Sequence, residues 1–374
     1  MRKQISFALS LFCILLPTLS ACADAQKPSE QSGSSASSAS DQPYIAVISK
    51  GFEAPFWQTV QKGAQDAAED YQVQISYEGP PSESDIASQV DMVKAALAKQ
   101  PDALCLAALD TESMTEQLIY ARDAGIPVIG FDSGVPDAPE NSIVATASTD
   151  NYAAGAYAAE QMFADETFQS LLQDASASAP VTIGVQPNDA TSQAGLERSH
   201  GFIDKMKTLA ESIHPDGVEV TGHDVFAQAA SGPVSVSISV AVPPSTNASD
   251  SQATASTQLN NNPNMIGYFL TTGIQTTAFL SATNDGTDLN CENGKYKNLT
   301  VIGFDSSATQ KNAVKNNYLL GSVSQNAYNI GYYAVELAAK ARRGEEIDAD
   351  IDTGYVFYTS ENMDQPEIAE LLYD

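Results

Sequence analysis

The residues best suited to chemistry lie in a hexapeptide that occurs twice. Residues 128–133 and 301–306 both read VIGFDS. The apolar part predicts a buried parallel strand, and the Asp and Ser then lie at its carboxyl end. In open α/β sheets this end borders the crevice in which ligands bind. We interpret Asp132 and Asp305 as carboxylates from two similar lobes that face a shared cleft, although an Asp-Ser pair after a strand also suits a simple turn.

The elements that must position the first carboxylate alternate regularly from residue 44 onward. Gly125 predicts the turn after one of the helices, and residues 82–84 contain N-cap candidates for another. This alternation predicts a parallel sheet with right-handed crossovers. The predicted strands are 44–48, 73–77, 103–107 and 127–131, and the predicted helices are 56–71, 86–97 and 114–124.

The alternation restarts after residue 151 and predicts a second doubly wound sheet. Residues 234–242 alternate strictly between apolar and small side chains, which predicts a half-buried strand. We interpret this stretch as an extra edge strand or hairpin of the second lobe. The other predicted strands are 181–185, 218–225, 265–270, 299–304, 319–324 and 351–359, and the predicted helices are 152–163, 193–213, 276–282 and 328–343.

The amino-terminal residues predict export. Two basic residues precede an apolar run that is too short to span a bilayer, so residues 1–21 are interpreted as a signal peptide. Residues 19–22, LSAC, resemble the lipobox of bacterial lipoproteins, which implies a lipid on Cys22; an ordinary signal peptide with an incidental cysteine is the alternative. Residues 22–43 are rich in Ser and predict a flexible tether.

Composition and residue spacing argue against several classes of function. The chain has 18 Lys and Arg against 47 Asp and Glu, a net charge of -29, which disfavours nucleic acid or anionic lipid as partners. His200, His214 and His223 match no metal motif, and neither a nucleophile elbow nor a phosphate-binding glycine loop is present. We expect no enzyme activity, metal or cofactor, and we expect Cys105 and Cys291 to be free thiols.

Several further motifs occur in a fixed order between residues 44 and 374. They are APFW at 54–57, GIPVI at 125–129, Arg198 before HGF at 200–202, VIGFD at 301–305 and SVSQ at 322–325. In this order and spacing they resemble the ribose-binding-like group, the type I periplasmic binding proteins, of bacterial ABC sugar importers.

The resemblance implies a fold of two doubly wound parallel-sheet lobes joined by a three-strand hinge. The crossings between the lobes are then expected near residues 149–150, 325–326 and 353–354. The amino-terminal lobe is predicted to contain residues 44–149 plus 326–353, and the carboxy-terminal lobe residues 150–325 plus 354–374.

The resemblance also implies roles for individual residues. The aromatic pair packs on a sugar ring, the two carboxylates accept hydrogen bonds from its hydroxyls, and arginine and amide groups supply donors. Purely structural roles are the alternatives: the aromatic pair would belong to the core of the first helix, and the arginine would lie on the surface of its helix. The implied ligand contacts are Phe56, Trp57, Asp132, Ser133, Arg198, Thr272, Asp305 and Gln325.

The chain departs from the ribose-binding pattern at two positions. Ser133 stands where an arginine is typical, and Ala107 where an asparagine is typical. Lys50 after the first strand, together with YEGP at 77–80, resembles the branch that binds autoinducer-2 or related polyols, where a lysine at this place contacts the ligand. We predict that Lys50 supplies part of the missing donor capacity; a solvated lysine at the cleft mouth is the alternative.

Taken together, these features predict a monomeric substrate-binding lipoprotein of an ABC transporter. It would be extracytoplasmic, anchored through Cys22, and would deliver a sugar or small polyol to the permease. The alternative is a sensor that presents its closed form, loaded with autoinducer-2 or a sugar, to a membrane receptor or histidine kinase. Sugar-responsive repressors share the fold, but here a targeting segment precedes it instead of a DNA-binding headpiece.

Overall fold

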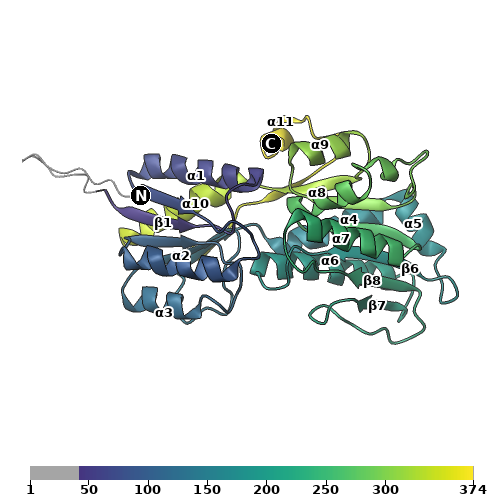
Figure 1. The fold of residues 1–374 in the computed structure, drawn as a ribbon, viewed down its shortest axis with the longest axis horizontal. Coiled ribbons are helices and arrows are strands. Elements are labelled where there is room, and N and C mark those ends of the chain that lie inside the picture. The colour runs from purple at the N-terminus through teal and green to yellow at the C-terminus, as the bar shows by residue number, and fades with distance from the viewer. Residues whose placement is uncertain (1–41, 374) are drawn as a thin grey trace, which may run out of the picture. The chain divides into compact units, whose positions relative to one another are not determined.

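The computed structural model describes residues 42–373, which form two α/β lobes, each built on its own sheet (Figure 1). The first sheet has six strands, all parallel: in order β12 (Asp350–Asp352), β5 (Ala145–Ser148), β4 (Val128–Phe131), β3 (Ala103–Leu106), β1 (Tyr44–Ile48) and β2 (Gln74–Glu78). The second has seven, of which only β13 is antiparallel to its neighbour: β13 (Tyr355–Tyr358), β11 (Gly321–Gln325), β10 (Thr300–Phe304), β9 (Met265–Leu270), β6 (Val181–Gln186), β8 (Val236–Val240) and β7 (Val218–Thr221). We call these the first and second lobes, and they confirm the predicted fold class.

Helices cover both faces of the first sheet. In β1, Ile45 and Val47 pack with one pair of helices, whereas Ala46 and Ile48 pack with the other pair. Because successive side chains of a strand point to opposite faces, a strand buried on both sides must be apolar throughout. The helices are α1 (Pro55–Tyr71) and α10 (Ala327–Arg342) on one face, and α2 (Ile86–Ala98) and α3 (Thr115–Asp123) on the other (Figure 1).

The second sheet is covered in the same way. One face packs against α4 (Asn151–Ala164), α5 (Glu166–Gln173) and α6 (Gln193–Glu211), and the other against α7 (Ala248–Asn261), α8 (Gly273–Ala282) and α9 (Ala308–Lys315). A short 3-10 helix (Thr287–Leu289) and α11 (Pro366–Ala369) lie in the connections of this lobe. Both lobes are therefore doubly wound.

Glycines bring one helix pair of each lobe into close contact. A Cβ atom at Gly63 of α1 would lie 2.0 Å from a carbonyl oxygen of α10, and one at Gly331 of α10 would lie 1.9 Å from a carbonyl oxygen of α1. In the second lobe Gly155 of α4 and Gly201 of α6 have the same relation, each 2.0 Å from the partner helix. The carbonyl oxygen that Gly155 meets belongs to Arg198, so this packing positions a candidate site residue.

The chain passes between the two sheets three times. The crossings lie between β5 and α4, between β11 and α10, and between β12 and β13. The single final strand predicted over 351–359 is therefore wrong: it is two strands in different sheets. Gly354 lies between them with φ 80, a left-handed conformation that favours glycine.

The alternating stretch is not an edge strand. Its core, β8, lies between β6 and β7 and pairs with both in parallel, so β7 is the edge strand. Val236, Ile238 and Val240 are buried with one helix layer. Ser239 faces α7 on the other side, where its Oγ accepts a hydrogen bond from Nε2 of Gln258 at 3.3 Å. The alternating pattern indicates a strand with one apolar and one polar face, but it does not indicate whether the strand lies at the edge or in the middle of the sheet.

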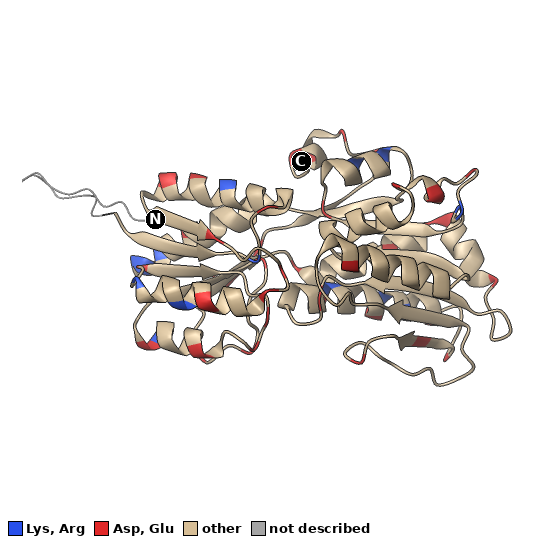
Figure 2. Ribbon diagram, viewed as in Figure 1, with Lys and Arg blue, Asp and Glu red and all other residues tan. Residues whose placement is uncertain are grey.

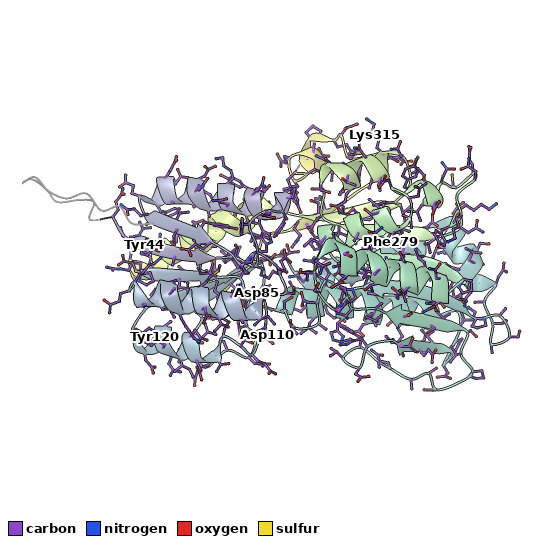
Figure 3. All side chains as sticks on the ribbon, viewed as in Figure 1. Tyr44, Asp85, Asp110, Tyr120, Phe279 and Lys315 are labelled. Carbon is purple, nitrogen blue, oxygen red and sulfur yellow. The ribbon has the colours of Figure 1, made fainter. Side chains whose placement is uncertain are left out.

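Smaller differences from the sequence-based expectations follow from local structure. The N-cap of α2 is Asp85, labelled in Figure 3, whose side chain accepts a hydrogen bond from the N–H of Ser88 at 3.0 Å. β5, α5 and α9 were not predicted, and each of them is short: β5 has 4 residues, and α5 and α9 have 8 each. Cys105 and Cys291 are both free, as expected.

Asp and Glu lie over both lobes in the view of Figure 2, and Lys and Arg are fewer. Within residues 42–373 none of the helices combines the length and the apolar character needed to cross a bilayer.

Candidate functional site

A cavity of about 320 Å³ lies between the two lobes, at the carboxyl ends of strands from both sheets. Its volume is at the lower end of the range typical of small-molecule sites. The candidate ligand contacts that line it are Lys50, Phe56, Trp57, Asp132, Arg198, Thr272, Asp305 and Gln325. The structure thus brings together all but one of the residues that the sequence singled out.

The two copies of the hexapeptide have the same geometry at their carboxylates. The N–H of Asp132 donates to the carbonyl oxygen of Ala147 at 3.0 Å, and the N–H of Asp305 donates to that of Val323 at 2.6 Å. Both aspartates have positive φ, 56 and 72 respectively. Residues other than glycine adopt this conformation rarely, and aspartate does so more readily than most. Each strand therefore ends in a turn that aims a carboxylate at the cavity.

Asp132 is paired with Lys50. The Nζ atom of Lys50 lies 2.8 Å from Oδ2 of Asp132, and both residues are buried, at 7% and 3% exposed. Lys50 follows β1 and Asp132 follows β4, so the pair spans the end of β3, which lies between these two strands. Burial by itself would lower the pKa of Lys50, but the neighbouring carboxylates, chiefly Asp132 and then Glu83, outweigh it and raise the pKa. Lys50 is therefore a charged donor in the cavity wall.

Glu83 is a site residue that the sequence reasoning missed. It follows β2 and lines the cavity, and its Oε1 accepts a hydrogen bond from Nε1 of Trp57 at 2.7 Å. Its Oε2 accepts one from Nδ2 of Asn188, in the second lobe, at 3.1 Å. Burial raises the pKa of Glu83, although Lys50 and Trp57 oppose that shift. The sequence did contain one indication of this role, since Glu83 follows a predicted strand and lies at the same rim of the sheet as Lys50.

The aromatic pair belongs both to the core and to the cavity. Phe56 and Trp57 are members of the first lobe's hydrophobic cluster, with their rings edge to face at 4.8 Å, and both line the cavity. Trp57 also meets Phe131 edge to face at 6.5 Å. The expected ring contact with a ligand and the core alternative are therefore compatible, because one face of the cluster borders the cavity.

Arg198 is buried at 3% exposed and is not a surface arginine. Nη2 donates to Oδ1 of Asn151 at 2.6 Å and to Oε1 of Gln325 at 3.1 Å, and Nη1 donates to the carbonyl oxygen of Thr271. The ring of Phe304 lies 3.6 Å from the guanidinium carbon. Burial lowers the pKa of Arg198, and nearby aspartates oppose that shift. Partners on α4, β11 and the loop after β9 thus hold the guanidinium in one orientation.

Asp305 accepts hydrogen bonds on both carboxylate oxygens. Oδ2 accepts from the N–H of Gly273, the first residue of α8, at 2.7 Å, and Oδ1 accepts from Nε2 of Gln325 at 3.0 Å. The N-cap of α8 is Thr272, whose Oγ1 accepts from the N–H of Gln275 at 3.3 Å. A carboxylate at a helix N-terminus is stabilised by the free N–H groups there. Gln325 joins this carboxylate to Arg198 in one network.

Ser133 is the candidate that the structure does not bring to the cavity. It is 1% exposed, and its Oγ accepts a hydrogen bond from the N–H of Ala194, in the first turn of α6, at 3.2 Å. Because the turn after β4 aims Asp132 at the cavity, the next side chain points toward the second lobe instead. In this structure Ser133 links the two lobes.

The lining combines charged donors, charged acceptors and aromatic faces. Two cations and four carboxylates contribute: Lys50, Arg198, Glu83, Asp132, Asp189 and Asp305. Charged groups make the stronger hydrogen bonds, and an aromatic face suits C–H groups. Among residues 42–373 no three His, Cys, Asp or Glu side chains are grouped to hold a metal ion. The arrangement suits a small molecule with several hydroxyl groups.

Comparisons with known proteins agree with this geometry. A family model described as "Periplasmic binding protein domain" matches residues 45–346. A solved structure from Brachyspira murdochii, described as an ABC transporter, LacI family transcriptional regulator, is 35% identical, covers 89% of this chain and 99% of its own, and has a TM-score of 0.72. An ABC transporter solute-binding protein from Agrobacterium vitis, with bound D-fucose, is 28% identical, covers 88% and 100%, and has a TM-score of 0.71.

A third solved structure, the periplasmic component of an ABC-type sugar transport system from Hahella chejuensis, is 25% identical, covers 85% and 100%, and has a TM-score of 0.66. A comparison with curated proteins gives no match. The family match extends over most of the chain and includes both lobes. The chain therefore belongs to the periplasmic binding protein family.

Proposed function

We propose that this protein is the extracytoplasmic substrate-binding protein of an ABC transporter, and that it delivers a sugar or small polyol to the permease. The observation that carries the proposal is the cavity between the lobes, with Asp132 and Lys50 on one side and Asp305 and Arg198 on the other. The Agrobacterium vitis relative, which binds D-fucose, supports a monosaccharide as ligand.

The chemistry of the wall favours a neutral polyol. Each sugar hydroxyl both donates and accepts, and the cavity offers carboxylates as acceptors and an ammonium and a guanidinium as donors. Phe56 and Trp57 add apolar faces for the C–H groups of a ring. Four carboxylates against two cations disfavour an anionic ligand, because its charge would add to the acidic excess.

Ligand binding is proposed to hold the lobes together. The moving bodies would be residues 44–149 plus 326–353 and residues 150–325 plus 354–374, joined at the three crossings. Direct contacts already connect the lobes, among them Glu83 with Asn188 and Ser133 with Ala194. A ligand that contacts both lobes adds to these contacts and therefore favours the closed form. We propose that this closed form is the one that the permease recognises.

A thermal-shift screen tests the function. The purified protein is heated with neutral pentoses, hexoses, inositols and autoinducer-2, and with uronic acids as the anionic controls. A ligand that binds only the folded state stabilises it by about 4 kcal/mol at a concentration 1,000 times its Kd. We expect at least one neutral sugar or polyol to raise the melting temperature and the uronic acids to leave it unchanged. A melting temperature that none of the neutral compounds changes at millimolar concentration refutes the proposal.

Membrane attachment is a separate part of the proposal. Cys22 lies outside the residues that the structure describes, and its lipidation rests on the LSAC sequence at 19–22. Replacing Cys22 with Ser should move the protein from the membrane fraction to the soluble extracytoplasmic fraction. A variant that stays with the membrane would show that Cys22 is not the anchor. We also propose a monomer, which gel filtration with light scattering tests.

A further inference from the structure

A short segment after α11 runs along the carboxyl ends of the second sheet. The carbonyl oxygen of Leu371 accepts a hydrogen bond from Oγ of Ser324, in β11, at 3.0 Å. The N–H of Tyr373 donates to Oγ of Ser306, in the turn after β10, at 3.0 Å. These two bonds fix the segment to the second lobe, directly beside Asp305.

The side chain of Tyr373 leaves this lobe and packs against the other one. Its ring lies 6.0 Å from the ring of Phe56, tilted by 60°, and contacts the hydrophobic cluster of the first lobe. Tyr373 also lines the cavity between the lobes. One residue thus has its backbone on the second lobe, its ring on the first and its surface in the ligand cavity.

The hydroxyl group of Tyr373 lies within reach of the carboxylate of Asp305. It is buried, and among the described residues no group forms a hydrogen bond of good geometry with it. Burial, and after it the negative charge of Asp305, raises the pKa of Tyr373 well above its ordinary value, so the hydroxyl keeps its proton. Buried hydroxyls are nearly always satisfied, because an unpaired one costs free energy. A group in the cavity is the natural partner.

We propose that Tyr373 is a ligand-binding residue of this site, which rests on the proposed function. Its hydroxyl donates to the sugar hydroxyl that is held at Asp305, and its ring extends the apolar wall that Phe56 begins. Because the segment is bonded to the second lobe and the ring packs on the first, Tyr373 meets the ligand fully only when the lobes are together. It therefore contributes to slow ligand release as well as to affinity.

The test uses the full-length protein with Tyr373→Phe and Tyr373→Ala, and Tyr120→Phe as the matched control. Tyr120 lies on α3, is labelled in Figure 3, is 52% exposed and is not among the residues that line the cavity. Titration calorimetry and stopped-flow fluorescence use D-fucose, D-galactose, D-arabinose, D-tagatose and myo-inositol as probes. Removing a neutral hydrogen bond should weaken the affinity of the Phe variant roughly 2- to 10-fold. The Ala variant should have a still lower affinity for the probe and should release it faster than the wild-type protein does.

Deoxy analogues of the tightest-binding probe separate direct contact from a structural role. The effect of Tyr373→Phe should vanish for the one analogue that lacks the contacted hydroxyl, whereas a structural effect would be the same for all analogues. Wild-type affinity in both Tyr373 variants, or an equal loss for every analogue, overturns this inference alone. A wild-type protein that binds none of the probes overturns the proposed function and this inference with it.

Discussion

Replacing Lys50 with Met is the most demanding test of the site, because the change keeps the length of the side chain and removes its charge. In the structure Lys50 is 7% exposed and its ammonium lies 2.8 Å from Asp132. Glu83 and Asp189 also act on it electrostatically. The variant would leave these three carboxylates without their cation, and Arg198 would be the one cation among the residues that line the cavity in the described part of the chain.

The expected cost follows from the burial of the pair. Removing one partner of a buried ion pair destabilises a protein by about 3–5 kcal/mol, since the other charge stays buried and unpaired. We expect a value near the lower end, about 3 kcal/mol, because the pair borders a cavity that water can enter. The double variant Lys50→Met with Asp132→Asn should recover part of this loss, because the buried pair is then neutral whereas Glu83 and Asp189 still lack their cation.

Urea unfolding at pH 7 measures the effect as a shift of the midpoint at unchanged m-value. The pH dependence gives a second check. The pKa of Lys50 is raised above 10.5 in the folded state, so its contribution is present below that pH and is lost as the pH rises through the folded-state pKa. Lys50→Met should therefore lack this alkaline loss. A single variant with wild-type stability and wild-type ligand affinity would refute the reasoning and make Lys50 a rim residue.

Three further predictions concern other parts of the molecule. Asp305→Asn should weaken ligand binding by about 1.5–3 kcal/mol in titration calorimetry, because it removes a charged hydrogen-bond acceptor; unchanged affinity would remove Asp305 from the site. Gly331→Val should lower the melting temperature, since its Cβ would lie 1.9 Å from the carbonyl oxygen of Val60 and separate α1 from α10; equal stability would contradict the close packing. The hydrogen bond from Arg342 holds the pKa of Asp102 below 3.8, so Asp102→Asn should destabilise the protein at neutral pH, and the two stability curves should converge as the pH falls through that lowered pKa.

The strands and the rim of the site could be predicted from the sequence. A parallel strand covered on both faces must be apolar along its length, so runs such as 44–48 and 301–304 are visible without a structure. Residues that follow such runs lie at the carboxyl edge of their sheet, which is why Lys50 and Asp132 could be assigned to the rim of the first sheet and Asp305 to the rim of the second. The resemblance to a known family added the crossings between the lobes and the buried Arg198.

Only the tertiary structure decided which loops close the cavity. Glu83 meets Trp57 and Asn188, and Tyr373 meets Phe56, across long stretches of chain. Such contacts depend on how two lobes pack and leave no periodic signal in the sequence. Strand order is non-local in the same way, which is why β8 was placed at an edge although it lies between β6 and β7. Local sequence patterns determine the helices and strands of this protein. Residues distant in the chain determine the strand order and complete the site, because the strand order and the site depend on packing between segments that are not adjacent in the sequence.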